Sequence, residues 1–441
     1  MNINEIEIQV YLDKLGFIPA GTLTFDKVKK YSIFQYYETY MSQNFPVLNP
    51  ATLNYKRNNK KFFVTTYKDN HHMLDKTFWQ IVPNKDDWAN TLFLSFYPEC
   101  TYMSNSEKMF VVGDRTVGGI RSVLKSDNPK YRPVSNLEYL DNIRSDSISF
   151  YQNELKELKY IGALWALTNY AGQRPKCMYE ENGNEWVVKF NIQSDQYDNV
   201  ALEHIAMQMS KDVGLPTADT NLIKLPSGEN CIFVKRFDKD EEYQYLTFPL
   251  FALYKRMNKP KEYHTGQFIY RLVQTYSDYP ERDCEYIVHK LLFDIAINNT
   301  ENHLHNIKFR LNREQKWELA PFFDLSFNSE DKDYEYNPLN IPLSESYLNN
   351  PKLIEMFMES FDVSREFLEE KISNILTVVN NFHNYCDTYN IKIEDRKIIG
   401  NSIHLGLGRE KYTLTPELEK KYTLELEMKG PRPTPNGTKY S

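Results

Sequence analysis

Glycine, cysteine and long apolar runs are all scarce in this chain of 441 residues. The 16 glycines limit the places where the backbone could wrap around a phosphate group. The five cysteines are scattered and form no CxxC pair, which favours reduced thiols in a cytoplasmic protein over a disulfide framework. No apolar run approaches the roughly 18 residues that span a bilayer, so we expect no membrane segment.

Positive charge is also in deficit. The chain has 53 Lys and Arg residues against 60 Asp and Glu residues, a net charge of −7. This balance is a poor electrostatic basis for direct binding to nucleic acid. The first residues, Met1 to Glu5, are polar and acidic and predict no secretory signal. The hydrophobic fraction of 41% and the charged fraction of 26% are typical of a globular protein.

The N-terminal part, residues 1–125, predicts a small α+β unit. Apolar residues alternate along the first strand, and further short strands and loops follow up to the glycine-rich turn at 113–119. Residues 126–149 are polar, with two Asn-Pro or Arg-Pro pairs, and predict a linker. The alternating residues are Ile6, Ile8, Val10 and Leu12.

Residues 150–245 predict a β-rich small lobe. A helix over 150–170 is followed by strands at 177–180 and 186–190, joined at Asn182-Gly183, a strong hairpin signal. Asn199 is expected to cap the next helix, which ends at Gly214. A second hairpin pairs 220–225 with 231–237 around Ser227-Gly228.

Residues 246–411 predict a mostly helical large lobe, and 412–441 a frayed tail. Leucine and isoleucine at helical spacing indicate a helix over 281–298. The polar stretch that follows gives way to a β-like pattern over 307–319. Other helices are expected at 264–277, 350–388 and 391–404.

The first candidate site is the turn Ala171-Gly172-Gln173-Arg174-Pro175-Lys176. Its backbone amides could face an anion, with two cationic side chains nearby. Most turns of this kind only connect two elements, and that reading is favoured when the turn is taken alone.

Lys189 is the second candidate, because it lies within an apolar strand where an unpaired ammonium group is costly. Its natural partner is Glu203, in the first turn of the following helix. Protein kinases use such a pair to hold the phosphates of ATP. The alternative is an edge lysine that extends into water.

The third candidate is the segment 299–306 together with Asp324. The predicted hairpin returns the chain so that Asn306 can approach Asp324, and these hard oxygen donors suit Mg²⁺. The carboxylate of Glu301 could accept a proton from an attacking hydroxyl group. A plain polar loop is the alternative. A zinc site at His303 and His305 lacks further ligands.

Taken in order, these segments resemble the HipA family of serine/threonine protein kinases, the toxins of type II toxin–antitoxin modules. The likeness covers roughly residues 5–405. The segments that carry it are 172–176, Val188-Lys189, Glu203, Val234 to Asp238, 299–306 and 321–324.

The resemblance implies a two-lobed, protein-kinase-like α+β fold that uses ATP and Mg²⁺. Residues Ala171 to Lys176 would bind phosphate, and so would Lys189. The adenine would lie at the hinge, with Phe323 nearby. Glu301, His303 and Asn306 would form the catalytic loop, and Asn306 and Asp324 would hold Mg²⁺. The hinge residues would be Lys235, Arg236, Phe237 and Asp238.

The family also implies partners. In such modules the kinase binds a small helix-turn-helix antitoxin, so that this acidic chain would reach DNA only through its partner. The expected substrate is a protein hydroxyl group on a translation component such as an aminoacyl-tRNA synthetase. No residue of the sequence encodes that choice.

Three residues depart from the family pattern. Glu301 stands where the family has Asp, and the extra methylene displaces the carboxylate by roughly 1.5 Å, when about 1 Å can reduce a rate about 10²-fold. His305 replaces a common lysine. Asn169 stands where some members phosphorylate a serine. We therefore weigh an active kinase against a nucleotide-binding pseudokinase that acts through a partner, and against a protein that binds no nucleotide.

Overall fold

The computed structural model describes most of the two predicted lobes and parts of the N-terminal unit. The described residues are 5–26, 31–57, 61–64, 77–78, 90–91, 93–94, 97–103, 107–109, 115–123, 135–151, 174–253, 266–300, 304–328, 347–410 and 412–420.

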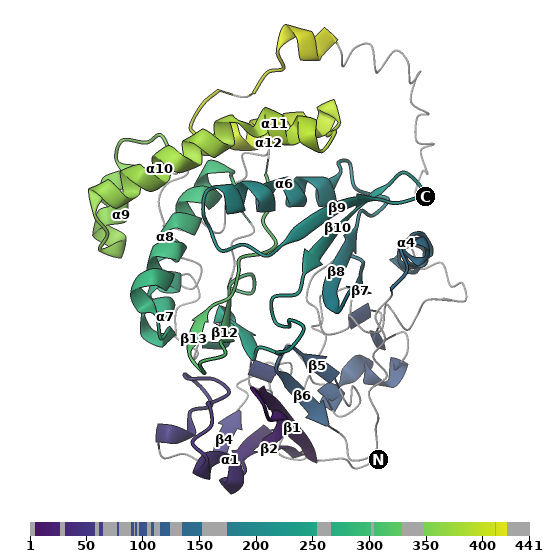
Figure 1. Cartoon of the computed structure of the whole chain (residues 1–441), viewed down its shortest axis with the longest axis vertical. Coiled ribbons are helices and arrows are strands. Elements are labelled where there is room, and N and C mark those ends of the chain that lie inside the picture. The colour runs from purple at the N-terminus through teal and green to yellow at the C-terminus, as the bar shows by residue number, and fades with distance from the viewer. Residues whose placement is uncertain are drawn as a thin grey trace, which may run out of the picture.

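A six-stranded antiparallel sheet forms the N-terminal region (Figure 1). Its order is β4-β3-β2-β1-β6-β5, and the predicted alternation in β1 is confirmed, because Ile6, Ile8 and Val10 are all buried. The short helices α1 (Glu38–Ser42), η1 (Tyr55–Arg57) and η3 (Pro98–Tyr102) lie in the connections. The strands are β1 (Glu5–Leu12), β2 (Gly16–Asp26), β3 (Tyr31–Tyr36), β4 (Lys61–Val64), β5 (Arg115–Val117) and β6 (Ile120–Val123).

A four-stranded antiparallel sheet follows, in the order β7-β8-β10-β9. Asn182 and Gly183 have φ angles of 50° and 76°, the left-handed pair that a two-residue hairpin turn requires. Both predicted hairpins are confirmed, although β10 ends two residues earlier than predicted. The strands are β7 (Lys176–Glu181), β8 (Asn184–Phe190), β9 (Thr220–Lys224) and β10 (Asn230–Lys235).

Helix α6 (Asn199–Asp212) packs against β9 and β10 (Figure 1). Its capping residue is Asp198 and not Asn199, since a carboxylate oxygen of Asp198 accepts a hydrogen bond from the backbone N–H of Ala201 at 3.2 Å. The same carboxylate accepts a hydrogen bond from Asn191. The helix therefore begins one residue earlier than predicted, and its buried face covers the sheet.

Helix α4 (Glu138–Tyr151) occupies much of the segment predicted as a linker. Its polar sequence gives little helical periodicity, but Leu140 and Ile143 are fully buried against the four-stranded sheet. Asp141 accepts hydrogen bonds from the backbone and hydroxyl of Ser227 in the β9–β10 turn. The helix predicted over 150–170 lies outside the described residues from position 152 onward.

The third sheet has the order β11-β12-β13, and its strands lie among the helices in the chain order. Helices α9 to α12 lie at the end of the molecule opposite the N-terminal sheet (Figure 1). The α+β class is confirmed, and so are the helices predicted over 264–277, 281–298 and 391–404, while the stretch 350–388 forms the three helices α9, α10 and α11. None of the described helices combines the length and apolar character that a bilayer crossing requires. The elements are β11 (Thr247–Pro249), η4 (Leu250–Leu253), α7 (Gly266–Tyr276), α8 (Pro280–Ala296), β12 (Lys308–Leu311), β13 (Trp317–Leu319), α9 (Leu353–Phe361), α10 (Arg365–Asn380), α11 (Phe382–Thr388) and α12 (Ile393–Gly406).

Candidate active site

Lys189 brings together two carboxylates from distant parts of the chain. Its Nζ atom donates to Glu203 Oε1 on α6 at 2.7 Å and to Asp324 Oδ1 at 2.5 Å. The side chains of Lys189 and Glu203 are 13% and 11% exposed, whereas that of Asp324 is 45% exposed. The three groups thus form an ion cluster that is buried on one side and open to solvent at Asp324.

The cluster holds two carboxylates but only one cation, Lys189. Burial alone would lower the pKa of Lys189, but the attraction of Asp324 and Glu203 more than offsets it, and the pKa of Lys189 lies above its usual value. Burial raises the pKa of Glu203, because one lysine shared with Asp324 compensates it only in part. Lys189 is therefore a permanent cation with two competing anionic partners.

The position of Asp324 is fixed by the residues around it. The backbone N–H of Phe322 donates to the carbonyl of Pro216 at 2.7 Å, and that of Ala218 donates to the carbonyl of Phe322 at 2.9 Å. Asp324 has a φ angle of 61°, a left-handed conformation that few residues other than glycine adopt. These contacts hold its carboxylate next to the β7–β10 sheet.

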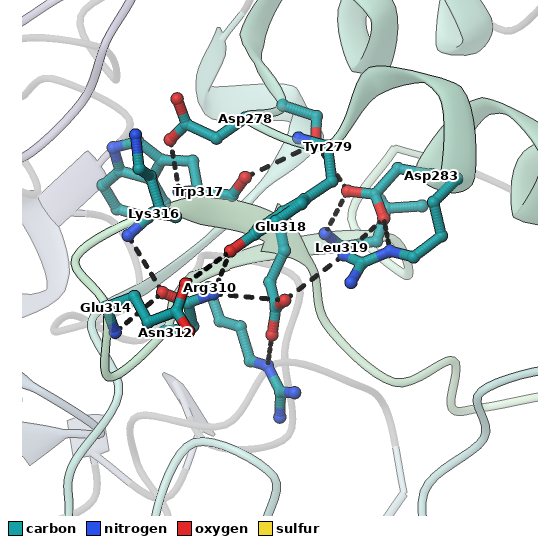
Figure 2. Close-up of polar contacts among 12 residues, drawn as sticks. Asp278, Tyr279, Asp283, Arg310, Asn312, Glu314, Lys316, Trp317, Glu318 and Leu319 are labelled. Carbon is teal, nitrogen blue, oxygen red and sulfur yellow. Dashed lines mark hydrogen bonds and ion pairs between the residues drawn. The ribbon is translucent and has the colours of Figure 1, made fainter.

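The β12–β13 hairpin that precedes Asp324 is anchored by a polar network (Figure 2). Asp278 accepts a hydrogen bond from the backbone N–H of Trp317 at 2.7 Å, and the buried Asp283 accepts one from Leu319 at 2.9 Å. Glu318 binds Arg310 at 2.8 Å and Arg282 at 3.2 Å. Strand β13 is therefore tied to the start of α8, which makes the hairpin a rigid support.

The hairpin places Asn306 and Asp324 at the same end, since Lys308 lies opposite Ala320. An amide oxygen and a carboxylate fit Mg²⁺, which commonly takes one or two protein carboxylates together with substrate phosphates. The preceding Leu304 is buried, and the ring of His305 packs on Phe251 at 4.3 Å. Glu301 and His303 lie outside the described residues.

The predicted hinge contains a second ion cluster. Arg236 donates to both carboxylate oxygens of Asp238, at 2.9 and 2.8 Å, and to Glu185 at 2.5 Å. The backbone N–H of Lys235 donates to the carbonyl of Asp219 at 2.8 Å. The Arg236 guanidinium thus binds both Asp238 and Glu185 of β8, and Glu185 also pairs with Lys239. Phe237, between Arg236 and Asp238, places its ring 5.2 Å from that of Phe323.

The predicted phosphate-binding turn is described only in part, because Ala171, Gly172 and Gln173 lie outside the described residues. Arg174 forms a two-pronged ion pair with Asp195, at 2.5 and 3.0 Å. The carbonyl of Pro175 accepts a hydrogen bond from Phe190 at 3.2 Å. Lys176 lies directly opposite Lys189 in the β7–β8 pairing. Two lysines on neighbouring strands therefore share one face of the sheet.

Sequence reasoning missed two supporting residues on α8. Lys290 and Asp294 form a buried ion pair at 2.5 Å. Asp294 also accepts hydrogen bonds from the backbone and side chain of Asn299, at the start of the third candidate segment. The signal was present, because opposite charges four residues apart in an apolar helix must pair when they are buried.

Lys308 was also missed. Its Nζ atom lies over the rings of Phe237 and Phe323, at 5.8 and 5.5 Å from their centroids. Burial lowers the pKa of this lysine, and the attraction of Asp238 and Asp324 opposes that effect only in part. No local pattern in the sequence indicates contacts between three segments so far apart.

Residues 168–382 match the protein family described as the HipA-like C-terminal domain. No curated protein sequence matches the chain. HipA of the Shewanella oneidensis MR-1 toxin–antitoxin system, solved with HipB and operator DNA, is 16% identical. That alignment covers 96% of this chain and 100% of that chain with a TM-score of 0.62, a likeness of fold.

A second solved structure, the proinflammatory kinase CtkA of Helicobacter pylori, is also 16% identical. The alignment covers 54% of this chain and 93% of that chain. Its TM-score is 0.35. The match to the HipA fold confirms the predicted two-lobed, kinase-like architecture.

Proposed function

We propose that this chain, in which residues 168–382 form a HipA-like C-terminal domain, is a serine/threonine protein kinase that uses ATP and Mg²⁺. The observation that carries the proposal is the position of Lys189 between Glu203 and Asp324. A phosphate-binding lysine has to be held by a helix carboxylate on one side while it faces the metal-binding carboxylate on the other. The described cluster supplies both contacts.

In this proposal each residue of the site has a defined role. The Lys189 ammonium group binds the α- and β-phosphate oxygens of ATP, and Glu203 orients it. Asp324 and Asn306 hold Mg²⁺, which when bound neutralises negative charge on the phosphates. The half-exposed carboxylate of Asp324 suits this task, because it can leave Lys189 for a cation without being pulled from a dry core.

The transfer itself moves the γ-phosphoryl group of ATP to the hydroxyl oxygen of a serine or threonine and releases ADP. Glu301 accepts the hydroxyl proton on its carboxylate. Most of the rate enhancement in such reactions comes from positioning and electrostatics. Lys189 and Asp324 are therefore expected to contribute more to the rate than the proton acceptor does.

The test is transfer of label from γ-labelled ATP to proteins of a cell extract in the presence of Mg²⁺. We expect Asp324→Ala to abolish transfer and Lys211→Ala to leave it unchanged, because Lys211 pairs with Asp219 in an exposed ion pair outside the site. Transfer that survives Asp324→Ala contradicts the assignment. Chelation of Mg²⁺ with EDTA should stop transfer by the wild-type chain.

A pseudokinase is the second candidate, and Glu301 favours it. In that case ATP raises the melting temperature of the wild-type chain, since a ligand that binds only the folded state stabilises it, but no label is transferred. Transfer that appears on Glu301→Asp identifies a weakened enzyme. A chain that shows no ATP-induced stabilisation belongs to neither class.

The partners follow from the fold neighbour. HipA of Shewanella oneidensis was solved with HipB and operator DNA, and we propose an analogous small helix-turn-helix antitoxin for this chain. A neighbouring reading frame that encodes such a protein supports the proposal. The substrate proposed is a protein of the translation apparatus, such as an aminoacyl-tRNA synthetase, which identification of the labelled protein tests directly.

A further inference from the structure

The segment from Arg236 to Leu246 carries the chain from β10 of the four-stranded sheet to β11 of the three-stranded sheet. The N-terminal sheet meets this segment at the turn between β5 and β6. A Cβ atom added to Gly118 would lie 2.5 Å from the carbonyl oxygen of Tyr245 and 3.0 Å from Asp238. One added to Gly119 would lie 2.5 Å from the backbone nitrogen of Leu246. Only glycine allows so close an approach.

Backbone hydrogen bonds continue this contact on both sides. The N–H of Tyr11 in β1 donates to the carbonyl of Gly119 at 2.8 Å, and the N–H of Gly119 donates to the carbonyl of Tyr245 at 2.8 Å. The N–H of Tyr245 then donates to the carbonyl of Asp238 at 2.9 Å. The Tyr11 hydroxyl donates to the carbonyl of Glu242 at 2.8 Å. A continuous path of hydrogen bonds thus leads from the N-terminal sheet to Asp238.

Asp238 transmits this contact to the candidate site. Its buried carboxylate holds the Arg236 guanidinium by two hydrogen bonds, and Arg236 in turn binds Glu185 on β8. Phe237 lies between the two clamped residues, and its ring contacts Phe323, the neighbour of Asp324. A shift of Asp238 therefore moves the aromatic pair next to the metal-binding carboxylate.

We propose that the Gly118–Gly119 turn is a positioning element that fixes Asp238, and through it Phe237, so that the affinity for nucleotide depends on the docked N-terminal sheet. The proposal rests on the proposed function, because it presumes that the site binds ATP. By reciprocity, bound ATP strengthens the docking of the turn by the same factor.

The experiment compares Gly118→Ala with Gly16→Ala in the full chain. Both glycines have positive φ angles, +55° and +68°, and both border strands of the same sheet, but a Cβ at Gly16 would meet nothing within 4 Å. Both variants carry the same kind of backbone strain, whereas only Gly118→Ala disturbs the contact. We expect the Kd for ATP with Mg²⁺, measured by calorimetry, to rise at least fivefold for Gly118→Ala and less than twofold for Gly16→Ala.

A second pair of variants, which changes only side-chain hydroxyl groups, tests the same coupling if a glycine variant fails to fold. Tyr11→Phe removes the hydrogen bond to Glu242 and is expected to raise the Kd about twofold to threefold. Tyr37→Phe removes the hydrogen bond that the Tyr37 hydroxyl accepts from Thr22 and the one that it donates to Glu7, both on strands of the same sheet, and should leave the Kd unchanged. Equal Kd values within each pair overturn the proposed coupling alone. Failure of the wild-type chain to bind ATP overturns the proposed function, and the coupling falls with it.

Discussion

Strand β8 carries one ion cluster near each end, and the two clusters differ in how much water they meet. At Glu185 the side chains of Glu185, Arg236 and Asp238 are 4%, 5% and 9% exposed. At Lys189 the cluster ends in Asp324, which is 45% exposed. A closed cluster satisfies its own charges and serves the fold, whereas an open cluster keeps a carboxylate within reach of a ligand.

The pKa values of the buried carboxylates in the two clusters are shifted in opposite directions. Burial would raise the pKa of Asp238, but the two hydrogen bonds and the charge of Arg236 outweigh it, and the pKa lies below its usual value. Burial raises the pKa of Glu203, because Lys189 divides its charge between two anions. The cluster at one end of β8 therefore contains a carboxylate that is stabilised as an anion, and the cluster at the other end contains one that is not.

The largest expected effect on folding is at the closed cluster. Arg236→Met removes the cation that both buried carboxylates share and leaves Lys239 as the remaining partner of Glu185. Loss of one partner of a buried pair costs about 3–5 kcal/mol of the free energy of unfolding. Urea denaturation measures this change. Arg313→Ala, which removes exposed ion pairs with Asp240 and Glu242, is the control and should have a much smaller effect. Equal losses of stability in Arg236→Met and Arg313→Ala would mean that burial does not determine how much an ion pair contributes to folding.

At the open cluster we expect a larger effect on binding than on folding. Lys189→Met should weaken ATP binding by roughly 10- to 100-fold, because a hydrogen bond to a charged group contributes about 1.5–3 kcal/mol. The loss of stability should be smaller than for Arg236→Met, since Glu203 can take up a proton and Asp324 can turn to water. Calorimetry and urea denaturation measure the two quantities. A stability loss as large as that of Arg236→Met would contradict the distinction.

The smallest expected effect is a difference in pH dependence. The pKa of Glu203 is raised from 4.5, so the stability it contributes is present below about pH 4.5 and is lost as the pH rises through the raised value. The Glu203→Gln variant has no titratable group at this position. Its stability relative to the wild-type chain should therefore rise from about pH 4 toward neutrality. Urea denaturation over a pH series measures this trend.

Asp238→Asn provides the opposite case. The pKa of Asp238 is lowered from 3.8, so its contribution is present above about pH 3.8 and is lost as the pH falls through the lowered value. The stability gap between the wild-type chain and Asp238→Asn should therefore narrow on acidification. Parallel trends for the two variants would show that the carboxylates do not differ.

Local chemistry predicted the elements whose signals lie within a few residues. The Asn182-Gly183 turn fixed one hairpin, and the apolar setting of Lys189 predicted its pairing with Glu203. Helix α4 was missed because its stability comes from Leu140 and Ile143, which are buried against a sheet formed later in the chain. The same holds for the closed cluster, since the bond between Arg236 and Glu185 joins residues 51 positions apart. Contacts of this kind follow from topology and not from neighbouring residues.

The backbone bonds of Phe322 have a consequence for motion. Both of its hydrogen bonds go to the connection between α6 and β9, and not to its own hairpin. A rotation that swings the four-stranded sheet away from α8 must therefore break both bonds or carry Asp324 along with the sheet. These two bonds form a short parallel β-bridge between Thr217 and Phe322. The rate at which a bound molecule enters or leaves would then depend on how fast this bridge, at residues 216–218, opens.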